Sequence, residues 1–210
     1  MKSYPSIRFV REVLGKVPGT QNWFVFDKLD GSNIRAEWTR KGGFTKFGTR
    51  NRLMDESDTQ FGEAITLFRE KYEEDLGIIF RHHRWQRAMA FFEFWGENSF
   101  AGTHADEEHT VTLIDVSVYK KGILMPEDFV DIFSEVDHAK LLHRGTVNME
   151  LVERVIAGEF PGVTTEGVVL KTRAPNRKPQ PLMAKVKTGA WLARLREKCD
   201  GDEAMFERLR

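Results

Sequence analysis

Hydrophobic and polar positions follow two different periods along the chain. Helical spacing occurs over residues 6–17, and over 59–83 apolar residues recur mostly at intervals of three and four, which predicts one long amphipathic helix or two short ones. Aromatic and β-branched residues predict strands at 22–28, 32–38, 42–49, 87–96, 110–119, 166–171 and 182–187. Further helical patterns lie at 126–133, 148–158 and 190–210.

The order of these elements predicts the fold class. Helices and strands come in groups without strict alternation, so we expect an α+β domain with largely antiparallel sheets flanked by helices. Asn148 is a suitable N-cap, Gly158 a suitable C-terminal stop, and the final helical segment should break near Gly201. The proline-rich segment 174–181 predicts a loop between two strands.

Length and composition limit the class of protein. The chain has 210 residues, of which 40% are hydrophobic and 30% charged, as in a globular protein with one large core. We therefore expect a single domain over 1–210, with residues 189–210 as a short helical extension. No apolar run approaches the roughly 20 residues needed to cross a bilayer, so we expect a cytoplasmic protein.

The net charge is zero, but basic residues are concentrated in two runs without a carboxylate. The first run spans 40–52 and the second spans 171–187. Such runs are usually solvated loops, although two of them beside one site would form a phosphate-binding surface. The single cysteine, Cys199, excludes an internal disulfide and a thiolate cluster for structural zinc.

Four short segments carry the candidate chemistry, and each lies on or beside a predicted strand: KLDG at 28–31, FWGE at 94–97, EGVVLK at 166–171 and KVK at 185–187. A lysine is a nucleophile only as the neutral amine, so such a role for Lys28 needs a site that lowers its pKa through burial or neighbouring cations. Lys185 and Lys187 are two residues apart, so on a strand both point to the same side. Glu166 begins an apolar strand and must find a cation or hydrogen-bond donors there.

In this order, the four segments resemble the motifs of the covalent nucleotidyltransferases, which include DNA ligases, RNA ligases and messenger-RNA capping enzymes. Asn33, the segment FGTRNR and the form FWGENSFAG are most similar to the RNA ligase 2 type found in phages and bacteria. The resemblance implies the ATP-grasp-like adenylation fold of ligases. It also implies an ATP-dependent RNA ligase that joins a 5′-phosphate RNA end to a 3′-hydroxyl, with ATP and Mg²⁺ or Mn²⁺ as cofactors.

The resemblance also implies roles for individual residues. Lys28 attacks the α-phosphate of ATP to form lysyl-AMP, and Lys185 and Lys187 contact that phosphate. Glu166 holds the metal ion. The remaining nucleotide-binding positions implied by the resemblance, together with the metal ligand, are Asp27, Asp30, Gly31, Asn33, Arg50, Glu97, Glu166 and Lys171. Glu97 is the implied ribose contact, whereas Glu93 is either a supporting residue or the partner of an arginine.

Two features depart from the pattern of the family. The strand that normally supplies an aromatic residue for the adenine ring has Ile114 beside Asp115, with no aromatic residue before Tyr119. No segment corresponds to the OB-fold domain of DNA ligases and capping enzymes. Open alternatives are therefore a minimal DNA ligase, a capping-type guanylyltransferase, or an inactive module that binds nucleotides or RNA ends. The physiological RNA substrate and the oligomeric state also remain open.

Overall fold

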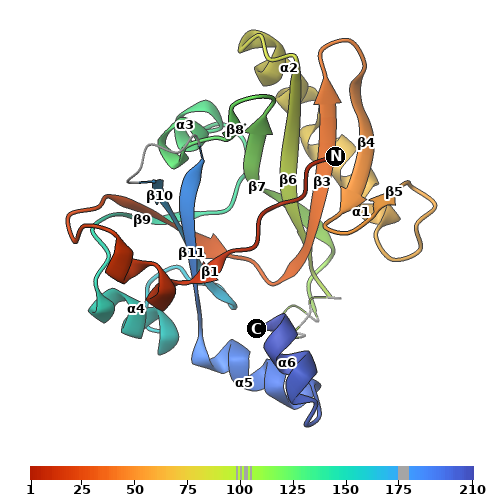
Figure 1. Ribbon diagram of the computed structural model, residues 1–210. Helices are drawn as coiled ribbons and strands as arrows, with labels where there is room; N and C mark the ends of the chain where they lie inside the picture. The colour runs from red at the N-terminus through yellow and green to blue at the C-terminus, as the bar shows by residue number, and fades with distance from the viewer. Residues whose placement is uncertain (98, 100, 102–103, 105, 175–179) are drawn as a thin grey trace.

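The computed structural model describes residues 1–97, 99, 101, 104, 106–174 and 180–210. Its strands form two sheets with helices around them (Figure 1). The first sheet has the order β1 (Arg8–Phe9), β11 (Pro181–Lys187), β10 (Gly167–Arg173), β2 (Trp23–Lys28), β9 (Leu141–Gly145). The second has the order β5 (Leu53–Met54), β4 (Gly43–Thr49), β3 (Gly31–Thr39), β6 (Arg87–Trp95), β7 (Thr110–Val118), β8 (Gly122–Ile123).

Neighbouring strands in both sheets run antiparallel, except for β1 and β11, which are parallel. The described helices are α1 (Gly62–Phe68), α2 (Glu74–His82), α3 (Pro126–Ile132), α4 (Met149–Ile156), α5 (Gly189–Lys198) and α6 (Glu203–Leu209). The expectation of an α+β fold with largely antiparallel sheets is therefore confirmed. None of these described helices is long and apolar enough to cross a membrane.

The helical pattern over 59–83 forms one run with an irregularity in its middle. A π-helical turn, η3 (Arg69–Glu73), connects α1 directly to α2. Phe68, Tyr72 and Phe80 are each at most 1% exposed, and they pack in the larger core against β3, β4, β6 and β7. A π turn shifts the helical phase, which keeps these rings on the face that covers the second sheet.

The prediction of a helix over 6–17 is wrong. This segment forms β1 and two short 3₁₀ turns, η1 (Val10–Glu12) and η2 (Leu14–Lys16). Val10 and Val13 are buried in the smaller core beside β2, β10 and β11. Their spacing of three suits a 3₁₀ turn, and the edge of β11 takes up the preceding residues as a parallel strand.

The helix ends follow the sequence signals. The Asn148 side chain accepts a hydrogen bond from Leu151 N at 2.9 Å, and Gly158 has a φ of +75° after α4. Gly201 has a φ of +84° at the break between α5 and α6. Residues 175–179 of the predicted loop, and Asn98, Phe100 and Gly102 of the FWGENSFAG segment, lie outside the described residues.

Candidate active site

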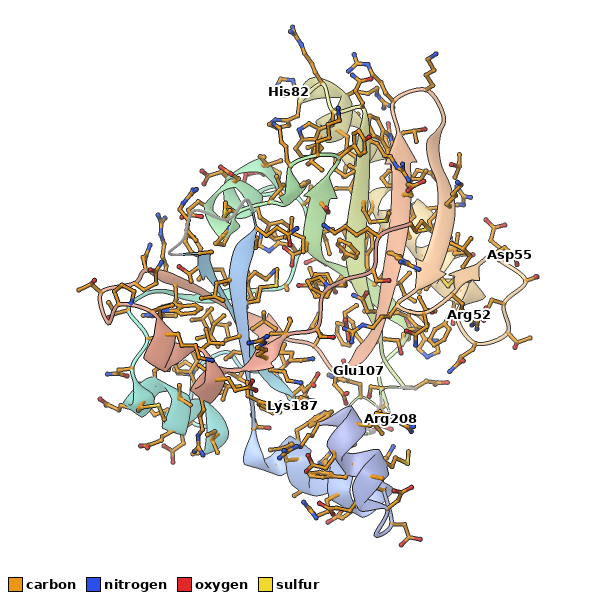
Figure 2. The ribbon with its side chains drawn as sticks, viewed as in Figure 1. Arg52, Asp55, His82, Glu107, Lys187 and Arg208 are labelled. Atoms are coloured by element: carbon orange, nitrogen blue, oxygen red, sulfur yellow. The ribbon has the colours of Figure 1, made fainter. Side chains whose placement is uncertain are left out.

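A cavity of about 700 Å³ is lined by residues of both sheets and of α5 and α6. Every site residue expected from the sequence lines this cavity, except for Glu97. Figure 2 shows two of the basic side chains at this end of the molecule, Lys187 on β11 and Arg208 on α6, far from His82 at the end of α2. Three of the four motif segments, KLDG, EGVVLK and KVK, therefore contribute to one site, whereas no residue of FWGE lines it.

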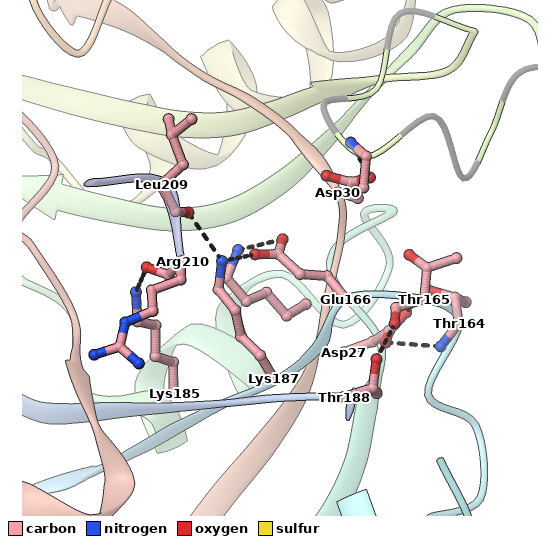
Figure 3. A network of polar contacts seen from close by, with 12 residues as sticks. Asp27, Asp30, Thr164, Thr165, Glu166, Lys185, Lys187, Thr188, Leu209 and Arg210 are labelled. Atoms are coloured by element: carbon pink, nitrogen blue, oxygen red, sulfur yellow. Dashed lines mark hydrogen bonds and ion pairs between the residues drawn. The ribbon is translucent and has the colours of Figure 1, made fainter. Parts of the chain in front are cut away.

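At the centre of the cavity, one carboxylate bridges two lysines. Glu166 Oε2 lies 2.6 Å from Lys28 Nζ, and Glu166 Oε1 lies 2.7 Å from Lys187 Nζ. The side chains of Glu166 and Lys187 are 5% and 4% exposed, whereas the Lys28 side chain is 20% exposed. The candidate nucleophile is therefore the most accessible member of the bridge, and Figure 3 shows the network.

Strand register explains why this cluster forms. Gly167 pairs with Lys28 on β2 and with Lys187 on β11, so the three positions lie side by side across the sheet. A Cβ at Gly167 would lie 2.0 Å from Val186 O, and the φ of Gly167 is +144°. Only glycine fits there, and the preceding Glu166 is thereby placed between the two lysines.

The K-x-D-G corner connects the two sheets. β2 ends at Lys28 and β3 begins at Gly31, so only Leu29 and Asp30 separate the strands. A Cβ at Gly31 would lie 2.3 Å from Phe94 O on β6, which explains the glycine by close approach of two strands. Asp30 Oδ2 accepts a hydrogen bond from Ala101 N at 3.1 Å and fixes the corner to the segment that follows β6.

The electrostatic environment of Lys28 differs from the one expected. Burial acts to lower the pKa of Lys28, but the surrounding carboxylates, with Glu166 first, outweigh burial and leave the pKa above its ordinary value. Burial alone would raise the pKa of Glu166, yet Lys28 and Lys187 hold it below its usual range. In this arrangement Lys28 is an ammonium group, so its activation requires Glu166 to turn away from it.

The two lysines of β11 are affected in the opposite direction. Burial, together with the nearby cations, lowers the pKa of Lys187 to about 8. Burial also lowers the pKa of Lys185, and Lys28 adds to that effect. Both lysines line the same cavity, as the two-residue spacing predicts. An incoming anion would restore their preference for the charged form.

Asn33 on β3 and Arg50, directly after β4, also line the cavity. Asn33 Nδ2 donates a hydrogen bond to Phe92 O at 3.3 Å, while no described residue donates to the buried Asn33 Oδ1. That oxygen is buried, so it could accept a hydrogen bond from a hydroxyl or amino group of a ligand only after the side chain turns toward the cavity. Arg52 forms an ion pair with Asp58 and is half exposed, as expected of a solvated residue.

Two residues expected to contact the nucleotide, Asp27 and Glu97, are not free to do so in this arrangement or lie outside the cavity. The Asp27 carboxylate accepts hydrogen bonds from Thr164 N at 3.1 Å and Thr164 Oγ1 at 2.8 Å, so it is already engaged beside β10. Glu97 is exposed and does not line the cavity. The chain turns at Gly96, whose φ is +135°, directly after β6 ends.

The structure also places residues in the cavity that the sequence did not assign to it. Glu93 of β6 lines the cavity, and burial raises its pKa to about 7. Its position four residues before Glu97 was the only sequence signal. Leu209 and Arg210 reach the cavity from the end of α6. No local sequence pattern predicts this long-range contact.

The other end of the cavity is less polar. Phe26, Ile114 and Val169 line it, and they provide apolar surface suited to a planar ring. Lys171 also lines this end, and its Nζ donates hydrogen bonds to Ile114 O at 2.7 Å and to Asp115 Oδ2 at 2.8 Å. Phe26 is therefore an aromatic candidate for contact with a base, and it lies on β2, whereas the resemblance implied a residue of β7.

The donor set for a divalent metal ion is small. No cluster of three potential ligands from His, Cys, Asp and Glu occurs among the described residues. Mg²⁺ usually binds through one or two protein carboxylates together with substrate phosphates and water, so a single carboxylate fits that ion. Glu166 is the cavity carboxylate that the two lysines keep ionised.

Comparison with solved structures identifies the fold. The structure titled Naegleria gruberi RNA ligase with PPi matches with a TM-score of 0.70 at 18% identity, covering 93% of this chain and 58% of that one. Variants of that ligase with ATP and Mn, and with AMP and Mn, each match with a TM-score of 0.68 at 16% identity. These matches cover 91% of this chain and 57% of theirs.

The fold is therefore that of the nucleotidyltransferase domain of RNA ligases, in agreement with the resemblance of the motifs. The chain spans somewhat more than half the length of the Naegleria protein. No protein-family model and no curated protein sequence matches the chain.

Proposed function

We propose that the protein is an ATP-dependent RNA ligase that works through a lysyl-AMP intermediate. The observation that carries this proposal is the cluster of Lys28, Glu166 and Lys187 in a cavity with an apolar end. A lysine nucleophile, further cations for phosphate and a carboxylate for Mg²⁺ or Mn²⁺ are the groups that nucleotidyl transfer requires. The solved structures of similar fold, which contain ATP, AMP and Mn, support the same choice of cofactors.

In the first step, transfer of AMP from ATP to Lys28, several residues of the chain have separate roles. The Lys28 amine forms a bond to the α-phosphorus of ATP, the bond from that phosphorus to the bridging oxygen breaks, and pyrophosphate leaves with the electron pair. Lys28 Nζ must first lose a proton to water, and this becomes easier when Glu166 turns away, because Glu166 is the carboxylate that raises the pKa of Lys28 most. Glu166 is also the residue that would hold a divalent metal ion. Lys185 and Lys187 are placed to stabilise the charge on the α-phosphate oxygens. A bound Mg²⁺ would neutralise phosphate charge.

The later steps use the opposite side of the cavity. AMP passes from Lys28 to a 5′-phosphate RNA end, and a 3′-hydroxyl then displaces AMP to join the strands. Arg50 suits the phosphate because a guanidinium offers several donors in one plane, and Asn33 Oδ1 suits a hydroxyl group. Asp30 and Gly31 hold the corner behind Lys28, and Lys171 lies beside the proposed base-binding end.

The test is incubation with Mg²⁺ and ATP or GTP labelled in the α-phosphate, followed by denaturing electrophoresis. We expect ATP to label the protein, and Lys28→Ala to reduce labelling by roughly a thousandfold or more, because it removes the nucleophile. Lys41→Ala is the matched control, since Lys41 is exposed in the turn between β3 and β4, away from the cavity.

Other outcomes separate the alternatives. Labelling by GTP alone would favour a capping-type guanylyltransferase. Sealing of nicked DNA but not of RNA ends by the labelled protein would favour a minimal DNA ligase. A folded protein that binds ATP but is never labelled would be a binding module, and the assignment of Lys28 as the nucleophile would then be wrong.

A further inference from the structure

The last turn of α6 occupies the part of the cavity where the two lysines of β11 meet. Lys185 Nζ donates a hydrogen bond to Arg210 O at 2.9 Å, and Lys187 Nζ donates one to Leu209 O at 3.3 Å. Figure 3 shows both contacts beside the bridge between Lys187 and Glu166. The lysines assigned to the α-phosphate thus already have acceptors, and α6 supplies them.

These acceptors resemble a weak anion. The last carbonyls of a helix lack partners within the helix and carry the negative end of its dipole, equivalent to about half an elementary charge. They therefore attract ammonium groups as phosphate oxygens do, but with less charge. Phosphate forms charge-assisted hydrogen bonds that are roughly twice as strong as those to neutral groups. A nucleotide phosphate can consequently displace the carbonyls.

The attachment of α6 suits such an exchange. α5 and α6 project from the end of β11 below the two sheets (Figure 1). Phe206 of α6 packs with Trp191 and Leu195 of α5 in a small hydrophobic cluster, which also includes Ala101 and is separate from the two larger cores. Asp202 caps α6 by accepting a hydrogen bond from Met205 N at 2.8 Å. Movement of α6 would therefore leave the packing within both sheets intact.

We propose that the last turn of α6 is an internal competitor of nucleotide phosphate, which holds Lys185 and Lys187 through its carbonyls and moves away when the phosphate binds. This inference rests on the proposed function, because that function supplies the competing ligand. Only molecules with undocked α6 can bind the nucleotide phosphate through both lysines, so the apparent Kd is the intrinsic Kd divided by the undocked fraction.

The experiment weakens α6 without changing any residue of the cavity. Asp202→Ala removes the N-cap of α6, and Asn148→Ala removes the corresponding N-cap of α4 as a matched control. Binding of α,β-methylene ATP with Mg²⁺ is measured by calorimetry, since the carbon bridge prevents transfer of AMP. We expect Asp202→Ala to bind about fivefold more tightly than the unmodified protein, the factor that corresponds to a cap of about 1 kcal/mol. Asn148→Ala should bind as the unmodified protein does.

Equal affinity of all three proteins would overturn the competition and leave the proposed function standing. Weaker binding by Asp202→Ala would also overturn it, because α6 would then be part of the nucleotide site. No binding by any of the three would overturn the proposed function and this inference together.

Hydrogen exchange gives an independent readout on the unmodified protein. We expect the nucleotide analogue to speed exchange of the amides in α6 and to leave those in α4 unchanged. Slower exchange in α6 would show closure over the ligand, and the inference would be wrong.

Discussion

Two buried clusters of lysine and carboxylate contribute lysines to the cavity, and they differ in charge balance. Lys171 and Asp115 are 3% and 1% exposed, and the Tyr4 hydroxyl donates to the same carboxylate. Lys171 Nζ also lies 4.7 Å from the centre of the Phe26 ring. One positive and one negative charge are thus enclosed with a polar partner on the carboxylate.

In the second cluster, Glu166 forms ion pairs with both Lys28 and Lys187. Lys185 donates a hydrogen bond to the carbonyl oxygen of Arg210. Positive charge is in excess there. A balanced pair that is almost fully buried stabilises the fold, whereas a carboxylate shared by two lysines leaves positive charge available to an anion. The comparison teaches that burial alone does not identify the reactive lysine.

The largest effect is expected from Lys171→Met. Removal of one partner leaves the Asp115 carboxylate buried without its cation, which should lower the free energy of unfolding by about 3–5 kcal/mol. Denaturant unfolding measures this change. The double variant Lys171→Met with Asp115→Leu should recover part of the loss, because no charge then stays unpaired. A double variant with fully additive losses would contradict the pairing.

Glu93→Gln is expected to have a smaller effect, which is a change in how the free energy of unfolding depends on pH. Burial raises the folded-state pKa of Glu93 from 4.5 to about 7, so the folded protein binds this proton more tightly than the unfolded chain. The stability from Glu93 is therefore fully present below about pH 4.5 and is lost as the pH rises through 7. Relative to the unmodified protein, Glu93→Gln should gain roughly 2 kcal/mol in the free energy of unfolding between pH 5 and pH 8. Parallel pH curves for the two proteins would show that Glu93 titrates normally.

The smallest effect on stability is expected from Lys185→Met, the same substitution as at Lys171. Lys185 is partly exposed and has no carboxylate partner among the described residues, so the free energy of unfolding should change by no more than about 0.5 kcal/mol. Labelling by ATP should fall at least tenfold, because a phosphate contact is lost. If Lys185→Met lowered the free energy of unfolding as much as Lys171→Met does, both lysines would stabilise the fold equally and the comparison would be wrong.

The sequence predicted the parts of the site that depend on strands. Glu166 and Lys187 lie within short motifs on paired strands, so the register alone brings them to Lys28. Glu97 was expected at the site because the FWGE segment resembles a motif of the family, but the chain leaves β6 at Trp95 and turns at Gly96, whose φ is positive. Local spacing cannot show where a strand ends to within one residue.

Other features depended on contacts that no local pattern contains. The strand β9 was missed because its residues do not alternate in burial, and pairing with β2 alone makes it a strand. The docking of α6 joins Lys185 to a carbonyl 25 residues away. The raised pKa of Lys28 likewise depends on Glu166, 138 residues away in the sequence.

The corner between Lys28 and Gly31 also acts as a mechanical link. Leu29 and Asp30 span from the end of the first sheet to the start of the second, and Asp30 is fixed to Ala101. A change in the angle between the sheets therefore moves Lys28 Nζ directly relative to Arg50 and Asn33. The packing of the two cores thus fixes where Lys28 lies relative to Arg50 and Asn33, in addition to the ion pair of its amine with Glu166.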